Sequence, residues 1–220
     1  MALSTPQPIP DEAQLALAYT APFMRAALRI FLEFDLRLAR IVSATNEPML
    51  GQMRLAWWRD TLGMAVSERP GGDAVLDGLG AEWAGHEPAL IALVNGWECM
   101  LSEPPLSSDA ASCFVDGRVA GFAGLCALGG GDAVTGEAIK KAARIWALAD
   151  AASHVAQPTE RQTLLDLAAS APRPARLASP FKGIAVLAAL GERSIKAGGA
   201  PLMAGRGAAL VALRAGLLGR

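Results

Sequence analysis

The chain has 220 residues, a formal net charge of −1 and an isoelectric point near 6.1. This balance excludes the strongly basic surface by which many proteins bind nucleic acid. Hydrophobic residues make up 52% of the chain but aromatic residues only 5%, so the apolar content is mostly alanine, leucine and valine, which favours helices over strands.

The first part of the chain predicts a tail followed by two helices. Residues 1–10 are rich in proline and are expected to form a disordered tail, ahead of a single helical domain over 11–220. Asp11 and Gln14 have the spacing of a capping box, which predicts a helix start there. Within 28–42, apolar residues then recur every three or four positions, as on one face of a long helix.

The rest of the chain continues as helices with short connections. A helix is expected from Pro48 until "SERPGGD" at 67–73 ends it, and Asp73 is expected to cap the next one. No alternating strand pattern and no internal repeat occurs, so the sequence predicts an all-α fold of roughly eight to ten helices. Further helices are expected at 88–101, 110–128 and 136–157, from Thr159, and twice within 181–220.

Cysteine usage and the absence of apolar runs bear on the compartment. Cys99, Cys113 and Cys126 form no C-x-x-C pair, which argues for a reducing environment and against a disulfide framework. The N-terminus has prolines where an export signal needs an apolar run, and no uncharged stretch of about 18 residues predicts a spanning helix. We therefore expect a cytoplasmic protein, with peripheral attachment to the inner membrane as the alternative.

Short catalytic motifs are missing from the sequence, and its acidic pairs are few. Asp73 and Asp77 lie four residues apart, so that on one helix face they could share Mg²⁺, although a helix cap explains Asp73 equally well. Asp150 and His154 also share a helix face, but no further acid lies four residues from either. These pairs alone do not define a metal site.

The stretch "EPMLGQMRLAWWRDTL", residues 47–62, combines two tryptophans with two arginines. Helical spacing puts Trp58 on one face with Leu55, and this face is expected to belong to the core. Arg54 and Trp57 lie on a neighbouring face and are expected to line a cavity. Arg59, like Arg54, can bind phosphate groups or pair with nearby acids.

Three segments in a particular order resemble a known family. "RAALRIFLEFDLRLARIV" (25–42) precedes an L-x-x-W-R pattern at 55–59, and "RVAGFAGL" (118–125) is similar to a V-A-G-x-V-G helix. "ARIWALADAASH" (143–154) then stands where a Q-x-x-N-x-x-R-D helix is expected. Together they resemble the squalene/phytoene synthase family over roughly 13–157.

This resemblance implies an all-α fold of the isoprenoid synthase type, in shortened form. Active members join two prenyl diphosphates head to head, and two aspartate-rich motifs hold the Mg²⁺ that takes up the leaving diphosphate. In the second segment, Gly121 and Gly124 leave one helix face nearly bare. Such a face permits close packing or leaves room for a long apolar chain.

Both metal motifs are altered in this chain. The first falls on Leu38, Ala39 and Val42, none of which binds a metal, and at the second His154 stands in place of the family's aspartate, while Asp150 replaces its asparagine. The family includes a branch without these motifs that is linked, in mitochondria, to assembly of respiratory complex I. The segment from Phe34 to Leu62 resembles that branch.

We therefore expect a non-catalytic member of the family that needs no cofactor. Its partner would be a prenyl diphosphate or lipid chain, or a protein during assembly of a membrane complex. One alternative is a divergent active prenyltransferase with Mg²⁺, which requires several of its aspartates to converge: Asp35, Asp60, Asp73, Asp77 and Asp150. The other is a protein-interaction module with tryptophan and arginine anchors. The residues expected to line the cavity are Arg54, Trp57, Trp58, Arg59, Arg118, Gly121, Asp150 and His154.

Overall fold

The computed structural model describes residues 9–45 and 47–219, and within these ranges it is entirely helical. The all-α prediction and the expected number of helices are confirmed, while the expected tail at 1–8 lies outside the described residues. Ten α-helices and two 3-10 helices follow in chain order: α1 (Asp11–Tyr19), α2 (Pro22–Ser43), α3 (Pro48–Gly63), η1 (Val66–Glu68), α4 (Ala74–Glu82), α5 (Glu87–Cys99), α6 (Ser108–Leu128), α7 (Ala133–His154), α8 (Pro158–Ser170), η2 (Ser179–Phe181), α9 (Lys182–Lys196) and α10 (Ala208–Leu218).

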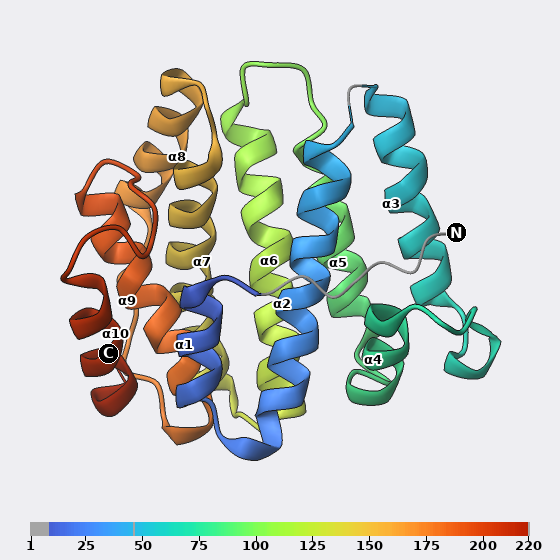
Figure 1. Ribbon diagram of the computed structural model, residues 1–220, viewed down its shortest axis with the longest axis horizontal. Helices are drawn as coiled ribbons and strands as arrows, with labels where there is room; N and C mark the ends of the chain where they lie inside the picture. Colours follow the sequence, from blue (N-terminus) through green and yellow to red (C-terminus); the bar gives the residue numbers. More distant parts are fainter. Residues whose placement is uncertain (1–8, 46, 220) are drawn as a thin grey trace.

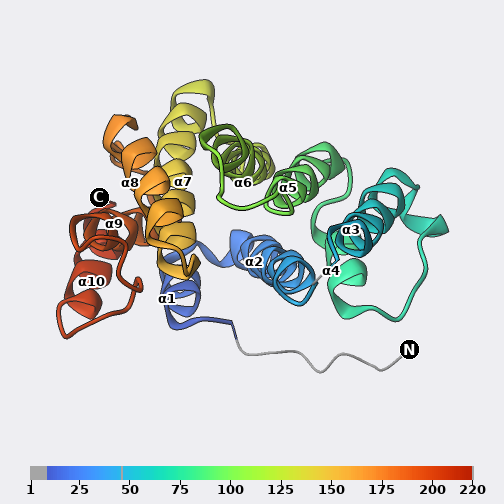
Figure 2. The same ribbon diagram turned by 90° about the horizontal axis from the view of Figure 1, so that it is seen from above.

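The helices pack around a row formed by α5, α6 and α7 (Figures 1 and 2). On one side of this row, α2 lies in front of α5 and α6, and α1 lies between α2 and α9. At one end α9 packs on α7 and α10 packs on α9, while at the other end α3 packs on α5 and α4 packs on α2. One continuous core of buried apolar side chains joins these helices.

The long helix α2 has the apolar face that the sequence predicts. Pro22 occupies its first position, where the missing N–H is not needed. Leu28, Phe31 and Leu38 are fully buried on the face that meets the other helices, and the Phe31 ring stacks on Trp83. Asp35 interrupts this apolar face and is almost completely buried.

The helices α5 and α6 approach so closely that a disulfide joins them. Gly96 and Gly117 face each other at the crossing, where a Cβ atom on Gly117 would lie 2.7 Å from the Gly96 Cα. Cys99 pairs with Cys113 across the same contact, with Cα atoms 6.2 Å apart, a separation typical of disulfides. The expectation that the cysteines form no disulfide framework is therefore wrong for this pair, because residues 14 apart in sequence meet across the antiparallel helix pair. Cys126 is free and buried.

The predicted caps have mixed outcomes. Asp73 caps α4 as expected, since its carboxylate accepts hydrogen bonds from the backbone N–H groups of Val75 and Leu76. The helix α1 begins at Asp11 as predicted, but the capping box is wrong: Pro10 holds the cap position and Asp11 already lies inside the helix. There its negative charge still interacts favourably with the helix dipole.

Among the described helices, α6 alone is long and apolar enough to cross a membrane. It is also the central helix of the fold, and 56% of its most apolar stretch is buried. A core helix of a soluble protein passes the same length and composition test, so this property gives no indication of a membrane-spanning segment.

Candidate functional site

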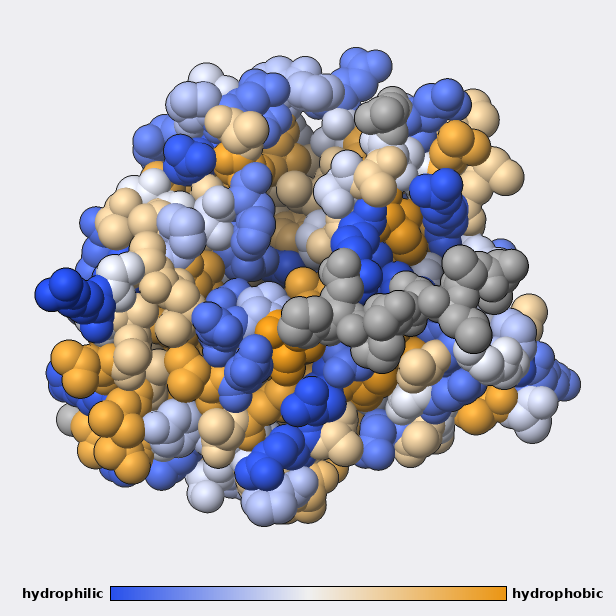
Figure 3. Space-filling model, in the orientation of Figure 1, coloured by the Kyte–Doolittle hydropathy of each residue, from blue (hydrophilic) through white to orange (hydrophobic). Residues whose placement is uncertain are grey.

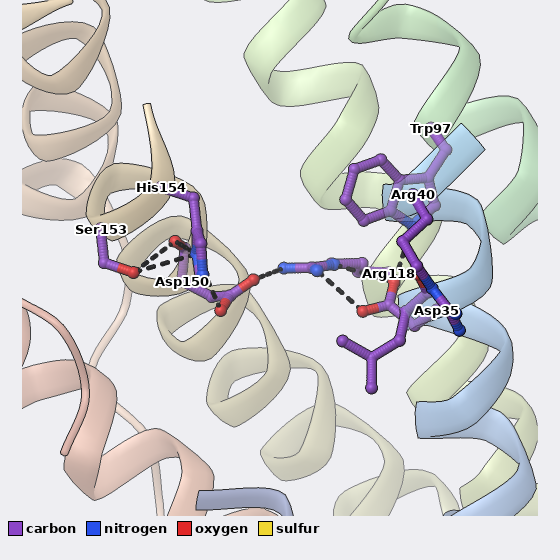
Figure 4. Close-up of polar contacts among 8 residues, drawn as sticks. Asp35, Arg40, Trp97, Arg118, Asp150, Ser153 and His154 are labelled. Atoms are coloured by element: carbon purple, nitrogen blue, oxygen red, sulfur yellow. Dashed lines mark hydrogen bonds and ion pairs between the residues drawn. The ribbon is translucent and has the colours of Figure 1, made fainter. Parts of the chain in front are cut away.

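A buried arginine connects three helices at the centre of the molecule. Arg118 of α6 has only 3% of its side chain exposed. Its Nε and Nη2 donate to the two carboxylate oxygens of Asp35 on α2, at 3.1 and 2.7 Å, and its Nη1 donates to Asp150 on α7 at 2.6 Å. Figure 4 shows the guanidinium lying between the two carboxylates. This two-point geometry is the strongest form of arginine–carboxylate pairing.

Aromatic rings surround the same guanidinium. Its carbon lies 5.0, 4.7 and 4.5 Å from the ring centroids of Trp97, Phe114 and Trp146, distances at which a cation is attracted by the ring faces. The Trp97 indole N–H also donates to Asp35 at 2.7 Å. The charged group is thus paired with two carboxylates and lies over three aromatic rings.

Burial and pairing act in opposite directions on the charges of this network. Burial lowers the pKa of Arg118, but the carboxylates of Asp35 and Asp150 outweigh it and raise that pKa above its usual value. Burial raises the pKa of Asp35 above its usual value, even though Arg118 and Trp97 oppose that effect. With both carboxylates ionised, the two acids and one base leave the network with one net negative charge.

A cavity of about 490 Å³ opens against this network between α2 and α7, above the start of α1. Figure 3 shows a hollow in the surface between the helices that Figure 1 labels α7 and α2. The volume lies within the range of about 300–1,000 Å³ that is usual for small-molecule pockets. Its wall is mostly apolar and includes Leu32, Leu36, Ala39, Val42, Trp146 and Leu187.

Ionisable side chains also line the cavity nearer its mouth. Arg40 of α2 and His154 of α7 line it together with Glu12 of α1. Arg40 donates through Nε to the Leu36 carbonyl at 3.2 Å, and the His154 side chain is 73% exposed, with Nδ1 3.5 Å from Asp150 Oδ1. Burial is the largest cause of the raised pKa of Glu12, and Asp150 adds to it, partly offset by His154.

Three of the residues predicted from the sequence meet at this cavity. Arg118, Asp150 and His154 all line its wall, although they come from two different helices. The expected motif positions are close by: Ala39 and Val42 line the cavity, and the neighbouring Leu38 is fully buried in the core.

The five other predicted residues lie away from the cavity. Trp58 packs in the core against Phe34, as its helix face predicts, whereas Trp57 is 46% exposed and Arg54 is also exposed. Arg59 binds Asn95 and Glu98 of α5. The expectation that α3 lines a cavity is corrected because α3 packs on α5, at the edge of the fold.

Gly121 does not leave room for a ligand either. A Cβ atom on it would lie 2.4 Å from the Phe31 ring, and one on Gly124 would lie 2.5 Å from the Ala89 Cβ. The sequence left open whether this bare helix face serves close packing or makes room for an apolar chain, and the structure shows close packing. The space next to Gly121 is filled by Phe31.

Sequence reasoning missed the part played by Asp35, Trp97 and Arg40. Asp35 carried a usable signal, because it is an acid on the otherwise apolar face of α2, and a buried acid requires a partner. Trp97 and Arg40 carried no such signal. The partner of Trp97, Asp35, lies 62 residues away in the sequence, and Arg40 faces the cavity only because α1 and α7 pack beside α2.

The donor set at the cavity fits an arginine better than a divalent cation. Asp35 and Asp150 converge there, but three of their four carboxylate oxygens accept hydrogen bonds from Arg118. Asp73 is engaged as a helix cap and in an ion pair with Arg37, and Asp77 accepts from the Gly72 N–H. Within 9–45 and 47–219, no three side chains of the metal-binding types cluster.

Comparison with known proteins adds no relative. The chain matches no family model, no curated protein and no solved structure. The resemblance to the squalene/phytoene synthase family, and the isoprenoid synthase type of fold that it implies, therefore stay predictions from the sequence motifs.

Proposed function

We propose that this protein binds the apolar chain of a prenyl or other lipid in the central cavity and does not convert it. The observation that carries the proposal is a mostly apolar cavity of suitable volume whose acidic residues are already engaged by Arg118. Apolar pockets with a few polar groups are the usual binding sites for such molecules. On this basis the chain is a pseudo-enzyme of the squalene/phytoene synthase type, and a role in assembling a membrane complex belongs to the same proposal.

The charge of the cavity sets the orientation of the ligand. With both carboxylates ionised the buried network has one net negative charge, which repels an anionic head group from the deep end. Arg40 and the largely exposed His154 also line the cavity, where a diphosphate or carboxylate can interact with them. The proposed ligand therefore has its chain inside and its head group outside.

The alternative of a divergent prenyltransferase requires carboxylates that can hold Mg²⁺ around a departing diphosphate. The two acids of the cavity would have to release Arg118 first, which would leave a buried cation without partners. This requirement favours binding over catalysis.

Filling the cavity is expected to abolish binding. Ala39→Trp projects an indole into the space between α2 and α7, so we expect the affinity for farnesyl diphosphate or farnesol to fall about ten-fold or more. Calorimetric titration measures this affinity. Quenching of the fluorescence of Trp97 and Trp146, which line the cavity, provides a second readout. The matched control is Ala81→Trp on the exposed surface of α4, which is expected to bind like the unmodified protein.

Two results would contradict this proposal. One is equal binding by the Ala39→Trp and Ala81→Trp variants, which would place the ligand elsewhere. The other is release of pyrophosphate from farnesyl diphosphate with Mg²⁺ above background, abolished by Asp150→Asn. That outcome would support the enzyme alternative.

Glu12 is expected to make the binding of anionic ligands depend on pH. Because burial raises its pKa, Glu12 takes up a proton at a higher pH than an ordinary glutamate does, and a negative charge then disappears from the cavity wall. Affinity for farnesyl diphosphate should therefore rise a few-fold as the pH falls from neutral to mildly acidic. The same proton linkage adds stability at low pH that is lost as the pH rises through the raised pKa.

The Glu12→Gln variant isolates this effect from changes in the ionisation of the ligand. It should bind more tightly than the unmodified protein at neutral pH, and the two affinities should converge in acid. An unchanged difference between the two proteins across this pH range would show that Glu12 does not titrate at the site.

A further inference from the structure

The C-terminal helix α10 has its apolar residues arranged the opposite way from an ordinary surface helix. Its buried face consists of small residues, and Gly216 lies directly against the Tyr19 ring. Its outer face carries Leu210, 69% exposed, Leu217, 60% exposed, and Leu213 between them. Figure 3 shows apolar side chains gathered at the lower left, where Figure 1 places α10.

These leucines contribute little to the core. Their positions at three- and four-residue steps form a continuous ridge along one side of the helix. Exposing apolar surface of this kind is unfavourable in water, and a contiguous patch marks a contact site. We call the three residues Leu210, Leu213 and Leu217 the leucine ridge.

The part of the chain around the leucine ridge is strongly basic. Residues 171–220 contain eight lysines and arginines and one acid, Glu192, a formal charge of +7, whereas residues 1–170 contain 12 basic and 20 acidic residues, a charge of −8. The net charge of −1 is therefore the sum of two regions of opposite charge. A second copy of the chain is a poor partner for the ridge, because two such basic regions would repel each other.

A second cavity of about 490 Å³ lies beside the ridge, between α7, α9, α10 and the segment 174–175. Arg193, Lys196 and Arg214 line it, together with one acid, Glu192. Arg193 Nη1 is buried and has no hydrogen-bond partner within the described residues. Helical spacing puts Arg214 between the leucine ridge and this cavity.

We propose that this surface docks on a membrane that contains anionic phospholipids. The leucine ridge enters the boundary between head groups and acyl chains, as the apolar face of an interfacial helix does. The phosphate of a lipid head group binds to Arg214 and Lys196 at the mouth of the second cavity, and the remaining basic residues are attracted to the negative surface. Docking here does not depend on any ligand in the central cavity.

Vesicle flotation with the full chain tests this docking. The protein should float with vesicles of phosphatidylcholine and phosphatidylglycerol, float much less with phosphatidylcholine alone, and dissociate as salt is raised. The triple variant Leu210→Gln, Leu213→Gln, Leu217→Gln should lose most of the binding. Arg214→Gln alone should weaken it about five-fold, because one basic residue near the surface contributes about that much.

The exposed apolar residues of α3 supply the matched control. Met49, Met53 and Trp57 are exposed at four-residue steps in the acidic part of the chain, so replacing all three by glutamine should leave flotation unchanged. Equal loss in the α3 and α10 variants would overturn the proposal. Binding that is indifferent to phosphatidylglycerol and to Arg214→Gln would overturn it too, as would a dimer in light scattering that the α10 variant separates into monomers.

Discussion

Replacing Arg118 by alanine is expected to lower the free energy of unfolding by about 3–5 kcal/mol. The substitution leaves Asp35, which is almost fully buried, and Asp150 without the cation that both carboxylates bind. An unpaired charge at this depth is far less favourable than the paired network, because water cannot reach it. Urea unfolding measures the loss, which should shrink in acid as Asp35 is protonated.

The control for this prediction is an arginine nearer the surface that also joins α6 and α7. Arg144 of α7 pairs with Asp116 of α6, and the two side chains are 34% and 62% exposed, so Arg144→Ala should change stability by no more than about 1 kcal/mol. Replacing the whole network, as Arg118→Met with Asp35→Leu and Asp150→Leu, should recover most of the lost stability. A small loss in Arg118→Ala, comparable to that in Arg144→Ala, would show that the network is not buried in solution.

Adding one methyl group at Gly117 is expected to destabilise the fold by about 2–3 kcal/mol. In most helices a change from glycine to alanine is favourable, by up to about 1 kcal/mol. Here the new Cβ would lie 2.7 Å from the Ala92 carbonyl oxygen and equally close to the Gly96 Cα. These are backbone atoms, so α5 and α6 would have to separate along their whole contact.

The control for this substitution is Gly63→Ala at the end of α3, where no atom lies within 4 Å of the new Cβ. This variant should be as stable as the unmodified protein or slightly more stable. Thermal unfolding of the two variants in parallel compares them directly. If Gly117→Ala also proves neutral, the close crossing of α5 and α6 is not present in the folded protein.

Local features of the fold could be read from the sequence because they depend on residues a few positions apart. The apolar spacing of α2, the start of α3 at Pro48 and the Asp73 cap all involve neighbours within one or two turns. Helical spacing also placed Trp58 on the core face of α3, as the structure has it, but the expectation that the neighbouring face with Trp57 lines a cavity could not be checked in this way. Trp57 and Trp58 are adjacent and chemically identical, yet one is exposed and the other is in the core.

The site was only partly predictable for the same physical reason. Asp150 and His154 share a helix face, so their proximity follows from helical geometry. The pairing of Arg118 with Asp35 joins residues 83 apart in sequence, and it depends on how three helices pack. A buried acid on an apolar face indicates that some partner exists, but it does not identify which of the chain's arginines it is.

The disulfide and the glycine crossing give the central cavity one stiff wall. Trp97 of α5 and Arg118 of α6 belong to a helix pair that is joined covalently and packed backbone to backbone. At Arg118, Asp35 of α2 and Asp150 of α7 are held to this pair by side-chain ion pairs. A bulky ligand can therefore widen the cavity only by displacing α2 or α7. Such a displacement would stretch the salt bridges of Arg118 with Asp35 and Asp150. The same three side chains thus limit the size of the ligand and stabilise the fold.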